Sequence, residues 1–161
     1  MSNAFKNLLV SYDKMPSGTK EAEDMLDRLK DFAETFSDWQ NLFFRSSPMG
    51  VFEKTVFFKM ATLAKTFGEW LSVYKEAKRI DKVVEDCAIH QLRVLANSPS
   101  DASSWAKDKN ALRISRWITI FNVSPINGQD EATALNNIIL LMKRGKEKQN
   151  NSPKDLSSKK L

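Results

Sequence analysis

Two groups of basic side chains recur at helical spacing and are best suited to chemistry with a ligand. In YKEAKRIDK, residues 74–82, offsets of three, four and seven place four cations on one helix face: Lys75, Lys78, Arg79 and Lys82. In WAKDKNALRISRW, residues 105–117, steps of four, four and three align Trp105, Lys109, Arg113 and Arg116. Cations bind phosphates, and a Trp ring stacks on a base. These residues predict binding of RNA or single-stranded DNA.

Both clusters also have an interpretation without a ligand. If a helix ends near Arg79, its last turn holds Lys75, Lys78 and Arg79, where the helix dipole favours each cation by about 0.3–1 kcal/mol. Acids at Glu76, Asp81 and Glu85 dilute the first cluster. Trp105 fits equally well as a core anchor at the start of its helix. Surface cations often serve solubility alone.

Catalytic patterns are weak. Cys87 and His90 lie three residues apart in CAIH, but their apolar neighbours predict that Cys87 is a small buried residue. One Cys and one His are too few for a zinc site. The chain has no phosphate loop, no dinucleotide-binding glycine pattern and no HExxH. We therefore expect neither catalysis nor a cofactor.

Carboxylates on one stretch could in principle hold Mg²⁺, since helical nucleotide hydrolases use similar spacings. The acids are Glu21, Asp24, Asp27 and Asp31. A second helix would have to return two further acids at the same spacing, whereas Glu85 and Asp86 are adjacent and point about 100° apart. The acids are better interpreted as a solvated face near a helix N-terminus, so we expect no metal site.

The composition is that of a globular helical protein. Apolar residues make up 42% of the 161 residues, with ten Phe and four Trp, while five Gly and five Pro are too few for an all-β chain. A single cysteine excludes an intrachain disulfide and fits a reducing interior. No apolar stretch approaches the roughly 20 residues of a membrane span. The expected location is the cytoplasm, with no membrane partner.

Charge is unevenly distributed along the chain, which has a net charge of +5. Residues 1–47 carry six Lys/Arg and eight Asp/Glu, whereas residues 145–161 carry five and two. An acidic front and a basic back favour either an anionic partner or head-to-tail self-association.

The elements that position these residues are predicted to be helices. We expect helices over 3–12, behind Ser2 as cap, from 17–19 to about 44, and over 48–97 with a break at 78–82 or, as second choice, at Gly68. Further helices are expected from 100 or 101 to about 122 and from 130 to 144, with Gly145 as a stop. Neither a strand nor an internal repeat is expected. The prediction is an all-α, single helical bundle of five or six helices over 1–145, followed by a disordered basic tail, 146–161.

Two long apolar stripes with steps of four and three support an alternative function. The first runs from Met25 to Phe43 and the second from Val56 to Ala77, and both are rich in Phe and Trp. They exceed what one small bundle needs, so part of this aromatic surface is available to a partner. The leading hypothesis is a non-enzymatic, oligomeric nucleic-acid-binding protein. The alternative is a protein-interaction module, an adaptor or inhibitor.

Overall fold

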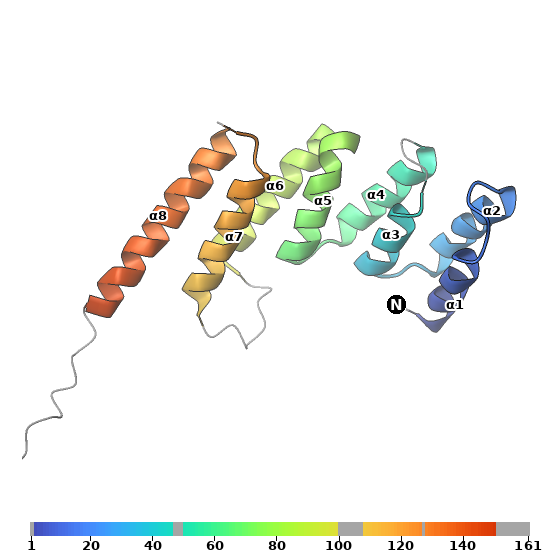
Figure 1. Ribbon diagram of the computed structural model, residues 1–161, viewed down its shortest axis with the longest axis horizontal. Coiled ribbons are helices and arrows are strands. Elements are labelled where there is room, and N and C mark those ends of the chain that lie inside the picture. Colours follow the sequence, from blue (N-terminus) through green and yellow to red (C-terminus); the bar gives the residue numbers. More distant parts are fainter. Residues whose placement is uncertain (1, 47–49, 100–107, 127, 151–161) are drawn as a thin grey trace, which may run out of the picture. The chain divides into compact units, whose positions relative to one another are not determined.

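Helices make up 80% of the chain in the computed structural model, and no strand occurs among the residues it describes, 2–46, 50–99, 108–126 and 128–150. The predicted all-α class is confirmed, but the predicted number of helices is wrong (Figure 1). The described residues form one 3-10 turn, η1 (Lys30–Phe32), and eight α-helices: α1 (Asn3–Tyr12), α2 (Lys20–Leu29), α3 (Phe36–Phe43), α4 (Val51–Leu63), α5 (Phe67–Ile80), α6 (Lys82–Asn97), α7 (Lys109–Val123) and α8 (Gln129–Asn150).

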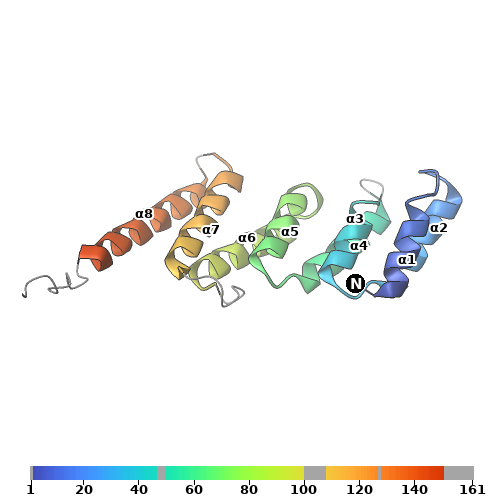
Figure 2. The same cartoon turned by 60° about the horizontal axis from the view of Figure 1, so that its bottom comes forward.

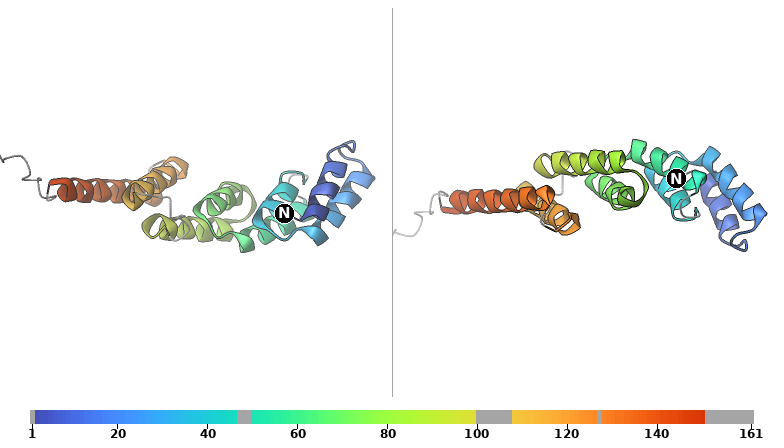
Figure 3. Two further views of the ribbon diagram at one scale, coloured as in Figure 1. Left: turned by 90° about the horizontal axis from the view of Figure 1, so that it is seen from below. Right: turned by 90° about the horizontal axis from the view of Figure 1, so that it is seen from above.

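The chain divides into two compact units, residues 1–90 and residues 91–161. The single domain over 1–145 stays a prediction. The predicted start of a disordered tail at 146 is wrong, because α8 continues to Asn150, and residues 151–161 lie outside the described residues. In the first unit, α1 packs against α2, α3 against α4, and α4 against α5. In the second unit, α7 packs along α8 as an antiparallel pair (Figure 2). Each unit is thus made of helices that pack on their neighbours in sequence, as the α1–α2 and α7–α8 pairs also show from above and below (Figure 3).

The first helix has the predicted bounds. The Ser2 side chain accepts a hydrogen bond from the backbone N–H of Phe5, which caps the helix, and the Phe5 side chain is fully buried. Beyond the helix, Gly18 adopts a positive φ of 76°, which suits glycine in a turn. Thr19 then caps α2 through the N–H of Ala22.

The predicted continuous helix to about residue 44 is wrong, because a helix start lies inside it. Thr35 and Asp38 form a capping box: the Thr35 hydroxyl accepts from the N–H of Asp38, and the Asp38 carboxylate accepts from the N–H of Thr35. These side chains satisfy backbone groups that a continuous helix would bond internally. The chain therefore leaves α2 through η1 and enters α3 in a new direction.

The predicted break at 78–82 is confirmed at Asp81, whose extended backbone separates α5 from α6. The Asp81 carboxylate accepts from the N–H of Val84 and so caps α6. Another break, at 64–66, was not predicted. There Thr66 and Glu69 form a second capping box, and Gly68 lies within the first turn of α5.

The two capping boxes belong to an internal repeat, so the prediction of no internal repeat is wrong. ETFSDW, residues 34–39, matches KTFGEW, residues 65–70. The number of residues from the first motif to the second also separates the first residues of α2, α4 and α6, which are Lys20, Val51 and Lys82. Equivalent core positions repeat at the same interval, and their side chains are buried: Phe5, Phe36 and Phe67 form one set, and Leu26, Phe57 and Ala88 another. A chain of successive similar helical hairpins is the organisation of helical repeat proteins.

The apolar stripes predicted from the sequence form the core, even though the helices that carry them are shorter than predicted. In the second stripe, Val56, Met60, Tyr74 and Ala77 are all at most 1% exposed. In the first stripe, Leu29 and Phe43 are buried, whereas Phe32 is 38% exposed because η1 turns it away from the α2 core face.

In the second unit, the helix ends differ from the predicted ones. Asp108 caps α7 by accepting from the N–H groups of Asn110 and Ala111, and the predicted start at 100–101 lies outside the described residues. Gly145 does not end α8. The Asn110 amide nitrogen would lie 3.6 Å from a Cβ at Gly145, and it donates a hydrogen bond to the Leu141 carbonyl oxygen. The glycine therefore marks a close approach of α7 and α8.

Candidate interaction surfaces

Two of the four cations in the first basic cluster are held by carboxylates. The Arg79 guanidinium lies 2.7 Å from Glu53 Oε1, in a side chain that is 4% exposed, and 3.4 Å from the Glu76 carboxylate. The hydrogen bond to Glu53 raises the pKa of Arg79. Lys82 Nζ lies 2.9 Å from Glu85 and 3.0 Å from Asp86, which together raise the pKa of Lys82 to about 12.

The other two cations of this cluster are exposed on α5. Lys78 Nζ lies 4.7 Å from the centroid of the Tyr74 ring, within cation–π distance. Lys75 lines a cavity of about 170 Å³ together with Phe43, Phe44 and Glu76. The first cluster is therefore a mixed surface: all four cations are exposed, but Arg79 and Lys82 are paired with carboxylates.

The second basic cluster is not one exposed stripe. Trp105 lies outside the described residues, and Lys109 is exposed as the first residue of α7. Arg113 is half-buried, and its Nε has no hydrogen-bond partner among the described residues. Arg116 is 8% exposed and donates a 2.8 Å hydrogen bond to the Leu95 carbonyl oxygen. Arg116 thus fastens α7 to the end of α6, and its predicted phosphate contact gains no support.

Residues weighed for catalysis are distributed over the surface. Cys87 is exposed, contrary to the prediction of a buried thiol, because Ala88, Ile89 and Leu92 occupy the core face of α6. The four acids Glu21, Asp24, Asp27 and Asp31, interpreted from the sequence as a solvated face, are exposed along α2 and η1. Throughout the described residues, no three His, Cys, Asp or Glu side chains are grouped to hold a metal ion. None of the helices in that part of the chain is long and apolar enough to cross a membrane.

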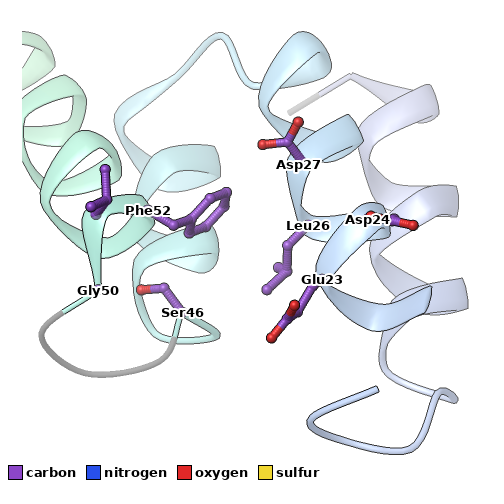
Figure 4. A pocket seen from close by; sticks show the side chains of 8 residues that line it. Glu23, Asp24, Leu26, Asp27, Ser46, Gly50 and Phe52 are labelled. Atoms are coloured by element: carbon purple, nitrogen blue, oxygen red, sulfur yellow. The ribbon is translucent and has the colours of Figure 1, made fainter. Parts of the chain in front are cut away.

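A groove lies between α2 and the start of α4 in the first unit. Its volume is about 360 Å³, and it is lined by Glu23, Asp24, Leu26 and Asp27 on one side and by Ser46, Gly50, Val51 and Phe52 on the other. Phe52 points across the groove toward Leu26 on α2 (Figure 4). Glu23 and Asp27 are four residues apart on α2, so their carboxylates lie on the same side of the helix. The groove therefore combines apolar side chains on both sides, Leu26 and Phe52, with carboxylates on the α2 side.

One cation is already bound beside this groove. Lys30 pairs with the Asp27 carboxylate, and its Nζ lies 5.2 Å from the centroid of the Phe52 ring. The Lys30 side chain is 29% exposed, so the ammonium group is partly withdrawn from water. Sequence reasoning missed this site, because the residues of its two walls come from segments far apart in the sequence.

In the second unit, α8 carries apolar side chains on two faces. Ala134 and Leu141 are buried, whereas Leu135, Ile139 and Met142 are 47%, 41% and 52% exposed. An exposed apolar row of this kind on a helix commonly marks a contact with another protein surface.

Comparison with known proteins finds no relative of the chain. No protein-family model, no curated protein and no solved structure matches the chain.

Proposed function

We propose that the chain is a non-enzymatic protein-interaction module that holds a basic segment of a partner protein in the groove between α2 and α4. The observation that carries the proposal is the position of Lys30, an ammonium group held between the Asp27 carboxylate and the Phe52 ring. The same two groups would hold a lysine or arginine side chain of a partner.

The lining of the groove matches the two parts of such a side chain. Leu26 is buried and Phe52 is half-buried, so they offer apolar contact to a hydrocarbon stem. Glu23 and Asp27 offer negative charge to its cationic end, and the Phe52 ring adds a cation–π contact. A volume of about 360 Å³ lies at the small end of the range of ligand sites, about 300–1,000 Å³, which suits one long side chain and its adjoining backbone.

This proposal is preferred to nucleic-acid binding because of how the cations are placed. Arg79, Lys82 and Arg116 already have carboxylate or backbone partners, which reduces what they offer to phosphate groups. Binding of RNA or single-stranded DNA stays a prediction from the sequence. Its predicted contacts are Lys75, Lys78, Arg79, Lys82, Trp105, Lys109, Arg113 and Arg116. Within the proposal, residues 1–145 act as one domain. The proposed location is the cytoplasm, because a lone cysteine suits a reducing compartment.

The proposal is tested with a fluorescently labelled peptide rich in Lys and Leu, measured by anisotropy at two ionic strengths. The native chain is expected to bind this peptide, more weakly at high salt, and to ignore a matched peptide in which Glu replaces Lys. Replacing Glu23 by Gln and Asp27 by Asn should weaken binding by about threefold to tenfold, since each exposed ion pair contributes about 0.2–1 kcal/mol. Lys30→Gln should strengthen binding, because the resident cation no longer competes.

Matched controls make the result specific to the groove. Glu21→Gln with Asp31→Asn removes the same charge from exposed positions that do not line the groove, and it should leave affinity within twofold. Equal weakening by both double variants would mean that only net charge matters and would contradict the proposal. A single-stranded RNA probe is run in parallel. RNA binding that is lost in a Lys75→Ala, Lys78→Ala variant would favour the nucleic-acid hypothesis instead.

A further inference from the structure

The outer face of α8 has the spacing of a helix–helix contact. Ala132, Leu135, Ile139 and Met142 follow one another at steps of three, four and three, and we call these four residues the α8 seam. All four are exposed, whereas Ala134 and Leu141, on the opposite face of the helix, are buried. Steps that alternate between three and four keep a straight apolar row toward a partner helix.

We propose that the α8 seam binds the α8 seam of a second copy of this chain, with the two helices antiparallel. The inference is independent of the groove in the first unit. A two-fold axis makes the same patch serve both copies, so a surface must be complementary to itself. Both the sizes and the charges along α8 meet this condition in one orientation.

The sizes of the side chains favour the antiparallel orientation. When the two-fold axis crosses the helix pair at the level of residue 137, Ala132 lies opposite Met142 of the other copy, and Leu135 lies opposite Ile139. Every layer then holds a similar volume, either one small and one long side chain or two branched ones. In a parallel pair, Ala132 would face Ala132 and leave a gap that costs stability.

The charges along α8 favour the same orientation. Its first turn carries Asp130 and Glu131, and its C-terminal half carries the exposed cations Lys143 and Arg144. Antiparallel pairing places each acidic end beside a basic end, whereas parallel pairing places the basic ends together. Asp130 pairs with Arg93 inside the chain, on the face of α8 that carries Ala134, so Glu131 is the acid beside the seam.

The size of the seam sets the expected affinity. From Ala132 to Met142, the seam covers about 15 Å of helix at a rise of about 1.5 Å per residue. Such a contact is smaller than stable interfaces, which bury about 1,200–2,000 Å² in total. We therefore expect a monomer–dimer equilibrium with a Kd on the order of micromolar to tens of micromolar.

Sedimentation equilibrium of the full chain, from about 1 to 200 µM, brackets that Kd and tests the proposal. Ile139→Lys should weaken dimerisation at least tenfold, because it places a charge in the centre of the seam. Leu140→Lys is the matched control: its side chain is 51% exposed on the same helix but lies off the seam, so this variant should dimerise like the native chain. If Ile139→Lys fails to fold by circular dichroism, the double change Lys143→Glu and Arg144→Glu replaces it and should also weaken dimerisation.

Cross-linking tests the orientation in a Cys87→Ser background. Mixing Leu135→Cys chains with Ile139→Cys chains should give the mixed disulfide faster than either chain pairs with itself. Faster self-pairing of Leu135→Cys would overturn the antiparallel arrangement. A chain that remains monomeric at about 200 µM, or that dimerises equally well with Ile139→Lys and Leu140→Lys, would overturn the proposal.

Discussion

Replacing Arg79 by Met is expected to destabilise the first unit by about 2 kcal/mol, less than the loss of a partner in a fully buried ion pair. Glu53 lies in the core of α4 with 4% of its side chain exposed, and its carboxylate accepts a 2.7 Å hydrogen bond from Arg79. Removing one member of a fully buried pair costs about 3–5 kcal/mol, since the other charge loses its partner. Arg79 is itself 40% exposed, so water screens part of this interaction and the expected cost is smaller. The Arg79 guanidinium carbon also lies 5.9 Å from the centroid of the Phe43 ring, so Met keeps much of the apolar stem but loses this cation–π contact.

Urea denaturation followed by tryptophan fluorescence measures this cost, and Glu76→Gln is the control. Glu76 also contacts Arg79, at 3.4 Å, but its side chain is 31% exposed, so this change should cost less than about 0.5 kcal/mol. Adding Glu53→Gln to Arg79→Met should recover part of the loss, because the buried charge is then gone. The reasoning is refuted if Arg79→Met is as stable as the native chain to within about 0.5 kcal/mol, or if Glu76→Gln costs as much.

Two further predictions concern a helix cap and an ion pair. Thr66→Ala should lower the free energy of unfolding in urea by about 1 kcal/mol, because it removes the side-chain cap of α5. Thr55→Ala is the control and should cost little, because the exposed Thr55 hydroxyl donates only to the Val51 carbonyl oxygen. Equal costs for the two variants would contradict a stabilising role of the cap. The hydrogen bond from Arg45 lowers the pKa of Asp13 in the folded protein below its usual value of 3.8. The pair therefore stabilises the fold at pH values above the pKa of Asp13 in the unfolded chain, and this stabilisation is lost as the pH falls through the lower pKa of the folded protein. An NMR titration of the Asp13 carboxyl should therefore show its pKa rising in Arg45→Gln, and an unchanged value would contradict the pairing.

Apolar periodicity predicted the core of this protein better than the bounds of its helices. The stripe from Val56 to Ala77 is a core stripe, although Ala64 and Lys65 interrupt the helix within it. Periodicity does not detect such a break, because the stepping of three and four continues across a short extended segment. The sequence signal for the break is a Thr followed three residues later by Asp or Glu, at Thr35 and again at Thr66.

The candidate surfaces were harder to predict, because their charges are set by distant partners. Glu53 and Arg79 lie on different helices, far apart in the sequence, and nothing beside Arg79 indicates a buried carboxylate. The repeat supplies the missing signal. Ala22 occupies the position equivalent to Glu53 in the preceding hairpin and is 3% exposed, so a glutamate at this core position implies an internal cation. Arg116 shows the same limit, since a cation in a regular row can still point into the protein.

The regular interval between the hairpins has a consequence for how the first unit unfolds, both locally and under mechanical tension. In a chain of similar hairpins, each hairpin is stabilised by itself and by the adjoining ones, so cooperativity decays with distance along the chain. Native-state hydrogen exchange should then show the α1–α2 and α3–α4 hairpins opening with different free energies. Tension applied between the two ends of the first unit should release the hairpins one after another in steps of similar contour length, rather than in a single event.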